Sequence, residues 1–422
     1  MMRHSRMKTG AAVLALAGLA VTLAGCSTSA APAAGGKVLT VSVDVEDRIT
    51  EIIANFEKAN PGVTVKVTAN SDSYDSYMQT LVAAGTAPDV IRTFPGAGNT
   101  MGTHVLGEAG VLADQSDADW VGELTDQQKA LFGFDDKVYS VPLGATGIGV
   151  LWNDQALESL GATPPETLPE LLGLCAQAKA AGKVAFTLFQ KGGNVVQSYA
   201  QVASLVYGND PSFTQEHLDG TQTFAGSGWQ QAFEQQLELN NAGCFNDSVN
   251  GTDWPASAKM VGDGDALGII AFSEISGLQA TAPADTTWTM AAMPTGDDAS
   301  DNYMAIADST GFGVNAKAKQ PELAAKFLAY LATAEAQNLF ANALGGAPAL
   351  PNDAFEPQNK QQEVVAKFKA DGKVGPWPDQ YWPDASVQAT LNDVVQELFA
   401  GSVTPAQAAE KMDASFVEAL AK

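Results

Sequence analysis

Apolar residues near the start of the chain follow first the spacing of a strand and then that of a helix. Residues 38–43 and 63–67 are apolar at alternate positions, which predicts two strands. Apolar residues at helical spacing occupy 49–56 and 74–82. A third strand is expected at 88–91. This alternation predicts a parallel α/β unit, in which ligands bind beyond the carboxyl ends of the strands.

The middle of the chain shows the same alternation and predicts a second α/β body. Thr167 and Glu170 have the spacing of a capping box, which marks the start of a helix. Strands are expected at 184–189 and 266–271, where apolar residues run together. From about Pro383 onward, the pattern predicts two helices. The tryptophans expected in the core are Trp152, Trp229 and Trp288.

The segment at 138–154, VYSVPLGATGIGVLWND, is predicted to cross between the two bodies. It begins as a short hairpin arm after the Asp135–Asp136 turn. Pro142 fixes one backbone dihedral angle, and the three glycines after it tolerate angles that other residues resist, so we expect the chain to bend here. A simple turn between two strands of one domain is the alternative that these residues leave open.

The N-terminal residues have the features of a bacterial lipoprotein signal. A basic stretch precedes an apolar run at 11–20, which is shorter than a membrane-spanning helix. Leu-Ala-Gly-Cys follows at 23–26 and matches the box in which the cysteine is lipidated. We therefore expect a signal peptide at 1–25, a flexible tether at 26–36 and a lipid on Cys26 that holds the protein at the outer face of the cell membrane.

The charge and the cysteines narrow the possible functions further. A formal net charge of -25 at pH 7 disfavours nucleic acid as a partner. Beyond Cys26 the chain has only Cys175 and Cys244, and outside the cytoplasm a disulfide between them is expected, with two separate buried thiols as the alternative. The motifs HExxH and GxSxG are absent from the sequence. We expect no enzymatic activity and no cofactor, and the sequence predicts no metal site.

Five stretches of the chain, taken in their order along the sequence, indicate a protein family. They are ITEIIANFEKANPGVTVKV, YMQTLVAAGTAPDVI, VYSVPLGATGIGVLWND, STGFGVNAKAKQPELAAKFLAYLATAEAQN and VVQELFAGSVTPAQAAEKM. Together they resemble the family 1 extracellular solute-binding proteins of ABC sugar importers, which are similar to maltose-binding protein. The resemblance implies an α/β protein with the two-lobe periplasmic-binding-protein-like fold (type II). Each lobe would be a β-sheet flanked by helices, with a cleft between the lobes and hinge crossings joining them.

This resemblance implies three crossings between the lobes, of which 308–311 and 347–351 would be the second and third. The predicted boundaries are 37–143 and 308–347 for lobe 1, and 144–307 and 348–422 for lobe 2. The implied function is that of a monomeric receptor that delivers a sugar or small oligosaccharide to an ABC transporter permease. Two alternatives stay open: a receptor for a polyamine, peptide or phosphodiester on the same fold, and a lipid-anchored glycoside hydrolase, which would need two carboxylates across the cleft.

Ligand contacts in this family fall in the loops after the strands. Aromatic rings suit the apolar faces of a sugar, while polar side chains suit its hydroxyl groups. Thr146 stands where maltose-type members often have a carboxylate, which disfavours a maltodextrin ligand. Asp44 and Glu46 could instead cap the first helix. The residues expected to contact the ligand are Asp44, Glu46, Arg92, Thr93, Phe94, Thr146, Gln190, Lys191, Asn194, Phe272, Ser273, Glu274, Trp377, Tyr381 and Trp382.

Overall fold

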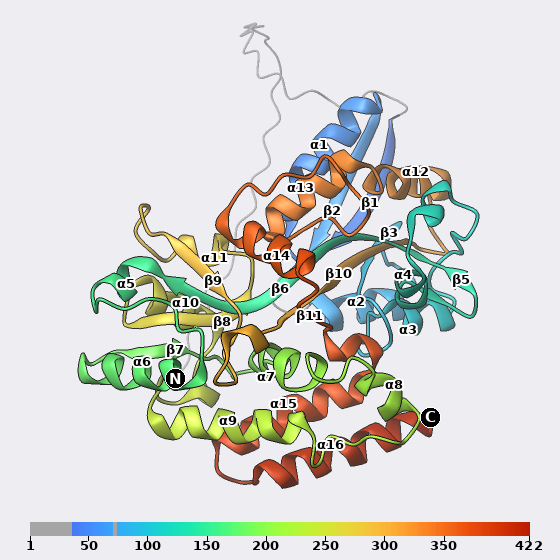
Figure 1. The fold of residues 1–422 in the computed structure, drawn as a ribbon. Helices are drawn as coiled ribbons and strands as arrows, with labels where there is room; N and C mark the ends of the chain where they lie inside the picture. The colour runs from blue at the N-terminus through green and yellow to red at the C-terminus, as the bar shows by residue number, and fades with distance from the viewer. Residues whose placement is uncertain (1–35, 71–73) are drawn as a thin grey trace, which may run out of the picture. The chain divides into compact units, whose positions relative to one another are not determined.

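A mixed β-sheet runs through the part of the chain that the computed structural model describes, residues 36–70 and 74–422 (Figure 1). Its strand order is β2-β1-β3-β10-β6-β8-β7, with β9 paired to β6 and β11 paired to β10. The predicted signal peptide, the lipidation site Cys26 and nearly all of the tether lie outside the described residues. The strands are β1 (Lys37–Val43), β2 (Val63–Ala69), β3 (Val90–Thr93), β4 (Gly133–Phe134), β5 (Lys137–Val138), β6 (Ser140–Asn153), β7 (Val184–Thr187), β8 (Ala266–Phe272), β9 (Trp288–Ala291), β10 (Met304–Val314) and β11 (Val374–Gly375).

Helices pack against this sheet and account for most of the remaining regular structure. They are α1 (Thr50–Ala59), α2 (Tyr74–Ala83), α3 (Thr103–Glu108), α4 (Asp126–Leu131), α5 (Asp154–Glu158), α6 (Leu168–Ala180), α7 (Val196–Val202), α8 (Phe213–Leu218), α9 (Gly228–Ala242), α10 (Trp254–Gly262), α11 (Ser276–Gln279), α12 (Pro321–Leu331), α13 (Ala334–Leu344), α14 (Lys360–Ala370), α15 (Ala385–Phe399) and α16 (Pro405–Leu420). Short 3-10 turns include η1 (Glu46–Arg48) and η6 (Pro378–Tyr381). Within the described residues, no helix combines the length and the apolar character that crossing a membrane requires.

The first α/β unit forms as its periodicity predicts. Strand β1 lies between β2 and β3 and is parallel to both. Leu39, Val41 and Val43 of β1 are fully buried, because alternate side chains of a strand point to the same face. The two C-terminal helices are also confirmed, and α15 and α16 lie beside α9 (Figure 1). The mixed α/β class predicted from the sequence is therefore correct.

Most of the segment at 138–154 forms one long strand, and the crossing predicted for it stays a prediction. Hairpin strands β4 and β5 flank the Asp135–Asp136 turn as expected, but β6 then continues as one buried strand. None of its three glycines has a positive φ. A Cβ on Gly144 would lie 2.8 Å from Phe340, and one on Gly149 would lie 2.4 Å from the carbonyl oxygen of Ala291. Close packing therefore explains these glycines better than backbone flexibility does. The pairing of β6 with β10 does shift register twice, first with one extra residue on β10 between Asp308 and Thr310 and then with one extra residue on β6 between Pro142 and Gly144.

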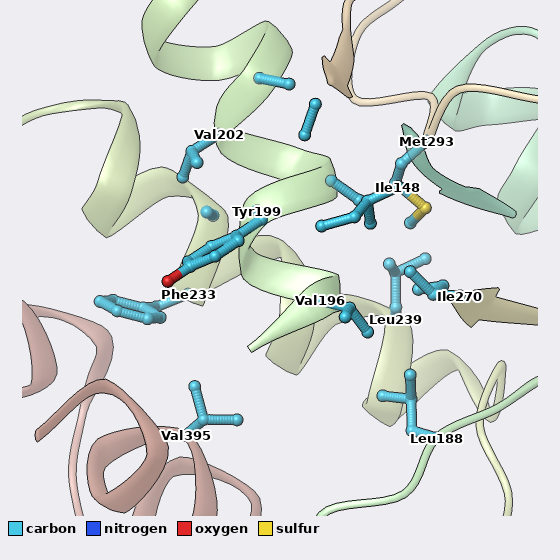
Figure 2. Close-up of a cluster of buried hydrophobic side chains, with 14 of the residues drawn as sticks. Ile148, Leu188, Val196, Tyr199, Val202, Phe233, Leu239, Ile270, Met293 and Val395 are labelled. Carbon is cyan, nitrogen blue, oxygen red and sulfur yellow. The ribbon is translucent and has the colours of Figure 1, made fainter. Parts of the chain in front are cut away.

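The second half of the chain is held by a disulfide and by a large apolar cluster. Cys175 of α6 is bonded to Cys244, as predicted. The capping box is incomplete: the Thr167 hydroxyl accepts from the amide of Glu170, but the Glu170 carboxylate accepts from the amide of Glu166. Figure 2 shows part of the cluster, in which Val196, Tyr199 and Val202 of α7 lie between Ile148 and Ile270 of the sheet and the side chains of Phe233 and Val395, with Leu239 of α9 on the sheet side.

Buried apolar side chains collect in several clusters within the compact unit formed by residues 37–422. One cluster draws its members from 39–143 and 312–350. Another draws its members from 148–305 and 382–419. The lobe boundaries themselves stay a prediction. The three tryptophans expected in the core are confirmed there, with exposed fractions of 0%, 0% and 3% for Trp152, Trp229 and Trp288.

Candidate ligand-binding site

A network of opposite charges joins the loop after β1 to the loop after β8. The guanidinium of Arg48, in η1, contacts the carboxylate of Asp44 at 2.7 Å and that of Glu274 at 2.6 Å. These three side chains are only 19–20% exposed. Burial acts to raise the pKa of Asp44, but Arg92 and Arg48 outweigh it and hold that pKa below its usual value. Asp44 is therefore a carboxylate kept ionised by two arginines.

Arg92, at the end of β3, lies in the same network and is almost fully buried. Its Nε is 3.4 Å from Asp44 Oδ1, and its guanidinium lies over the ring of Phe94 at 4.3 Å and over that of Tyr74 at 5.3 Å. The Tyr74 hydroxyl donates to the carbonyl oxygen of Arg92 at 2.8 Å. Arg92 Nε and Nη1 are buried and have no hydrogen-bond acceptor among the described residues. Nη1 is thus a buried donor without an acceptor, while Nε has only the ion pair with Asp44.

Two aromatic rings lie together at the sheet. Phe272, the last residue of β8, is 43% exposed, and its ring centroid lies 5.4 Å from that of Trp377. The indole Nε1 of Trp377 donates to the carbonyl oxygen of Ala305 in β10 at 3.4 Å, which fixes the ring beside the sheet. Glu274 follows Phe272 by two residues, so the ring pair is next to the charged network. An accessible aromatic surface beside paired charges suits a ligand with both apolar and polar faces.

The segment at 374–383 carries Trp377 and packs closely against the loop after β3. A Cβ on Gly96 would lie 1.9 Å from the carbonyl oxygen of Gln380, and one on Gly98 would lie 1.9 Å from that of Asp379. Only glycine permits this approach. The Tyr381 hydroxyl is hydrogen-bonded to the side chain of Gln127 in α4. The 374–383 segment therefore contacts both the loop after β3 and α4.

Trp382 lies apart from the other predicted aromatic contacts. It is 3% exposed and packs at 6.1–6.4 Å from the rings of Tyr199, Phe224 and Trp229 in the apolar cluster of α7, α9 and α15. Its neighbour Trp377 reaches the sheet surface instead. Because the segment has no regular period, the sequence does not indicate which of its rings points inward.

Three predicted contact residues have hydroxyl groups that serve the packing of the sheet. Thr93 donates to Ser140 at 3.0 Å, and Thr146 shares a hydrogen bond of 3.1 Å with Ser309 of β10. Ser273 donates to the carbonyl oxygen of the last residue of α13. All three residues are buried, with exposed fractions of 0–3%. Their hydroxyl groups are used in hydrogen bonds within the sheet and to α13, and they are not part of the charged network.

The polar loop after β7 also lies apart from this network. Gln190 and Asn194 are buried and hydrogen-bonded to one another, and Gln396 of α15 donates to the carbonyl oxygen of Gln190. Lys191 is exposed and pairs with Asp253 at 3.1 Å. The exposed Glu46 belongs to η1, and neither its side chain nor that of Asp44 caps α1. Of the predicted residues, the structure brings together Asp44, Arg92, Phe94, Phe272, Glu274 and Trp377.

Sequence reasoning missed several residues that shape the site. Arg48 could have been noticed as a partner of Asp44, because the two are four residues apart, but its link to Glu274 spans 226 residues. Tyr74 falls on the apolar face of a predicted helix, and nothing else in the sequence indicates a role in the site. Asp308, on β10, accepts a hydrogen bond of 2.8 Å from Gln128, and burial raises its pKa to about 6. It lines a cavity of about 750 Å³ together with Tyr381 and residues of α4 and α8.

Within residues 36–70 and 74–422, no group of three or more His, Cys, Asp or Glu side chains is arranged to hold a metal ion. The described site offers hydrogen-bond donors, acceptors and aromatic rings. Arginine donors, a carboxylate oxygen and two aromatic rings tilted at 43° to one another can bind a polar molecule through hydrogen bonds and ring contacts.

Comparisons with known proteins agree with this geometry. A family model described as bacterial extracellular solute-binding protein matches residues 51–367. The multiple sugar-binding protein of Streptococcus mutans is 24% identical over 401 residues, covering 90% of this chain and 92% of that protein. A solved chitin oligosaccharide binding protein aligns with a TM-score of 0.74 at 21% identity, over 92% of this chain and 100% of the other. A structure of SBP RafE in complex with raffinose aligns with a TM-score of 0.72 at 19% identity, over 91% of this chain and 99% of the other, and both structures support the fold.

Proposed function

This chain belongs to the bacterial extracellular solute-binding proteins, which act outside the cytoplasm, and we propose that it binds a sugar or small oligosaccharide and delivers it unchanged to the permease of an ABC importer. The similarity to a multiple sugar-binding protein over most of the chain supports this ligand class. The observation that carries the proposal is the buried Arg92, which lies beside Asp44 and is linked through Asp44 and Arg48 to Glu274, two residues after the exposed ring of Phe272.

Sugar hydroxyl groups fit this arrangement because each can donate and accept a hydrogen bond. Arg92 Nε and Nη1 would donate to hydroxyl oxygens, and Asp44 Oδ1, which is also buried without a hydrogen-bond partner, would accept from one. Leaving such groups unpaired in a buried site costs about 1–3 kcal/mol each, so a ligand that pairs them gains that free energy on binding. The rings of Phe272 and Trp377 would contact the apolar face of the sugar.

Asp44 and Glu274 do not form the pair of carboxylates that hydrolysis requires. A glycoside hydrolase needs one carboxylic acid that stays protonated, and therefore one raised pKa, opposite a second carboxylate. Here the pKa of Asp44 is lowered, and Arg48 pairs with both Asp44 and Glu274. The same pairing disfavours a polyamine, because both carboxylates already have cationic partners.

Attachment to the membrane is part of the proposal and rests on the sequence. The lipobox at 23–26 predicts a lipid on Cys26, and the residues up to 36 would give the binding unit freedom of position above the membrane. A lipid-anchored receptor of this kind would present its bound sugar to permease subunits in the same membrane.

A thermal-shift screen tests the proposed function directly. The compact unit at 37–422 is screened against sugars, polyols, amino acids and polyamines, since a ligand that binds only the folded state raises the melting temperature with its concentration. We expect a shift with at least one sugar, and a smaller shift in Phe272→Ala. Val417→Ala, which removes an exposed apolar side chain from α16, is the matched control and should keep the full shift. Shifts with charged non-sugars alone would contradict the sugar assignment.

A further inference from the structure

Asp379 is a buried carboxylate that the site described so far does not use. It lies in η6, within the 374–383 segment. Its Oδ2 accepts a hydrogen bond of 3.2 Å from Gln388 of α15. Its Oδ1 is buried and has no hydrogen-bond partner of good geometry among the described residues. None of the ion pairs found among those residues includes Asp379. An ionised oxygen is thus held away from water without a cation.

The groups packed around Asp379 do not offset its charge. Tyr199 of α7 is hydrogen-bonded to the Asp379 carboxylate, and its hydroxyl points away from Ile148 and Ile270 of the sheet (Figure 2). The other titratable groups that interact with this part of the segment are Tyr207 and Tyr381, and no lysine or arginine is among them. Burial raises the pKa of Asp379 to about 6, and Tyr199 and nearby backbone amides oppose the rise only in part.

The position of Asp379 connects it to the proposed sugar site. Trp377, two residues earlier, forms the ring pair with Phe272. The carbonyl oxygen of Asp379 lies against Gly98, four residues after the ring of Phe94 that covers Arg92. Asp379 therefore belongs to the segment that carries Trp377 of the ring pair and that contacts the loop after β3.

From this placement we infer that Asp379 is a specificity-determining residue of the sugar site, whose Oδ1 accepts a hydrogen bond from a hydroxyl group of the ligand. The inference rests on the proposed function. A buried acceptor without a partner is costly and uncommon in folded proteins, and a ligand hydroxyl would supply the missing donor. A carboxylate that only stabilised the turn would gain more from being exposed to solvent or paired with a cation, and Asp379 is neither.

The first test compares Asp379→Asn with Asp263→Asn in the full chain by isothermal titration calorimetry. Raffinose, maltotriose and chitobiose are the probes. We expect Asp379→Asn to raise the Kd of the sugar that the wild type binds by at least about tenfold, because the amide turns one acceptor into a donor. Asp263 is an exposed carboxylate that pairs with Lys259 of α10, outside the charged network, so Asp263→Asn should leave the Kd within about twofold. Equal Kd values for wild type and Asp379→Asn would overturn the inference and leave the sugar receptor intact.

The second test needs no variant at Asp379, in case Asp379→Asn does not fold. A hydroxyl donor favours the ionised carboxylate, so binding near pH 6 should release up to about half a proton, measured from the heats in two buffers of different ionisation enthalpy. The affinity of the wild type and of Asp263→Asn should weaken as the pH falls from 7 to 5, while that of a folded Asp379→Asn should stay flat. Binding without proton release would refute the role of Asp379. Failure of the wild type to bind any sugar of the wider thermal-shift panel would refute the proposed function as well.

Discussion

Removal of Arg48 should destabilise the protein more than removal of any exposed cation, because it leaves a carboxylate without its counterion. In Arg48→Met the apolar stem is kept and the guanidinium is lost. Glu274 would then retain only the hydroxyl of Ser276, which donates to its other oxygen at 2.6 Å, whereas Asp44 would keep Arg92. Breaking a buried pair from one side costs about 3–5 kcal/mol. Since these side chains are about one-fifth exposed, we expect a loss of roughly 2–3 kcal/mol.

A double-mutant cycle isolates the contribution of the pair itself. Glu274→Gln removes the carboxylate charge that Arg48→Met leaves without its counterion. The double variant should therefore lose less free energy of unfolding than the sum of the losses in the two single variants. We expect a coupling free energy of about 1–2 kcal/mol from urea unfolding curves with equal slopes. The exposed pair between Lys191 and Asp253 is the matched control, and Lys191→Met should cost under about 0.5 kcal/mol. A loss of stability in Arg48→Met no larger than that in the control, with no coupling, would refute the reasoning.

Three further predictions concern stability and processing. Burial lowers the pKa of His217 to about 4, so the unfolded chain binds more protons than the folded chain between pH 4 and 6.5. The free energy of unfolding should therefore fall by roughly 1–2 kcal/mol from pH 7 to 5, after allowance for solvent screening. His217→Phe should remove this pH dependence when unfolding is followed in urea titrations. Reduction of the Cys175–Cys244 disulfide, which joins residues 69 apart, should cost up to about 4 kcal/mol in a chain-entropy estimate, and two thiols that titrate in the unreduced, unfolded chain would contradict the bond. Cys26→Ser should abolish lipid labelling and cleavage before that position, and a labelled product would count against the anchor.

Local patterns predicted the fold well because they depend on residues close in sequence. Apolar residues alternate in β1 and β2 and follow helical spacing in α1, and this pattern indicates which face of each element is buried. The glycines of β6 were misread because their role depends on distant neighbours. Nothing near Gly144 in the sequence shows that Phe340 will lie against it, 2.8 Å from where a Cβ would be. Flexibility and close approach give the same sequence signal, and only the tertiary structure separates them.

The same limit explains which parts of the candidate site were found. Residues placed directly after strands, such as Asp44 and Phe272, were predicted because the carboxyl ends of strands meet at one edge of a sheet. Arg48 and Asp379 were not, since their significance arises from Glu274 and Gln388, which reach them from other elements. A carboxylate is ordinary in a sequence and becomes informative only when burial leaves it without a partner. Among the described residues, unpaired buried atoms lie on Asp44, Arg92 and Asp379 and also on core residues such as Trp152 and Trp229, so an unpaired atom supports a ligand contact only when other features of the site lie beside it.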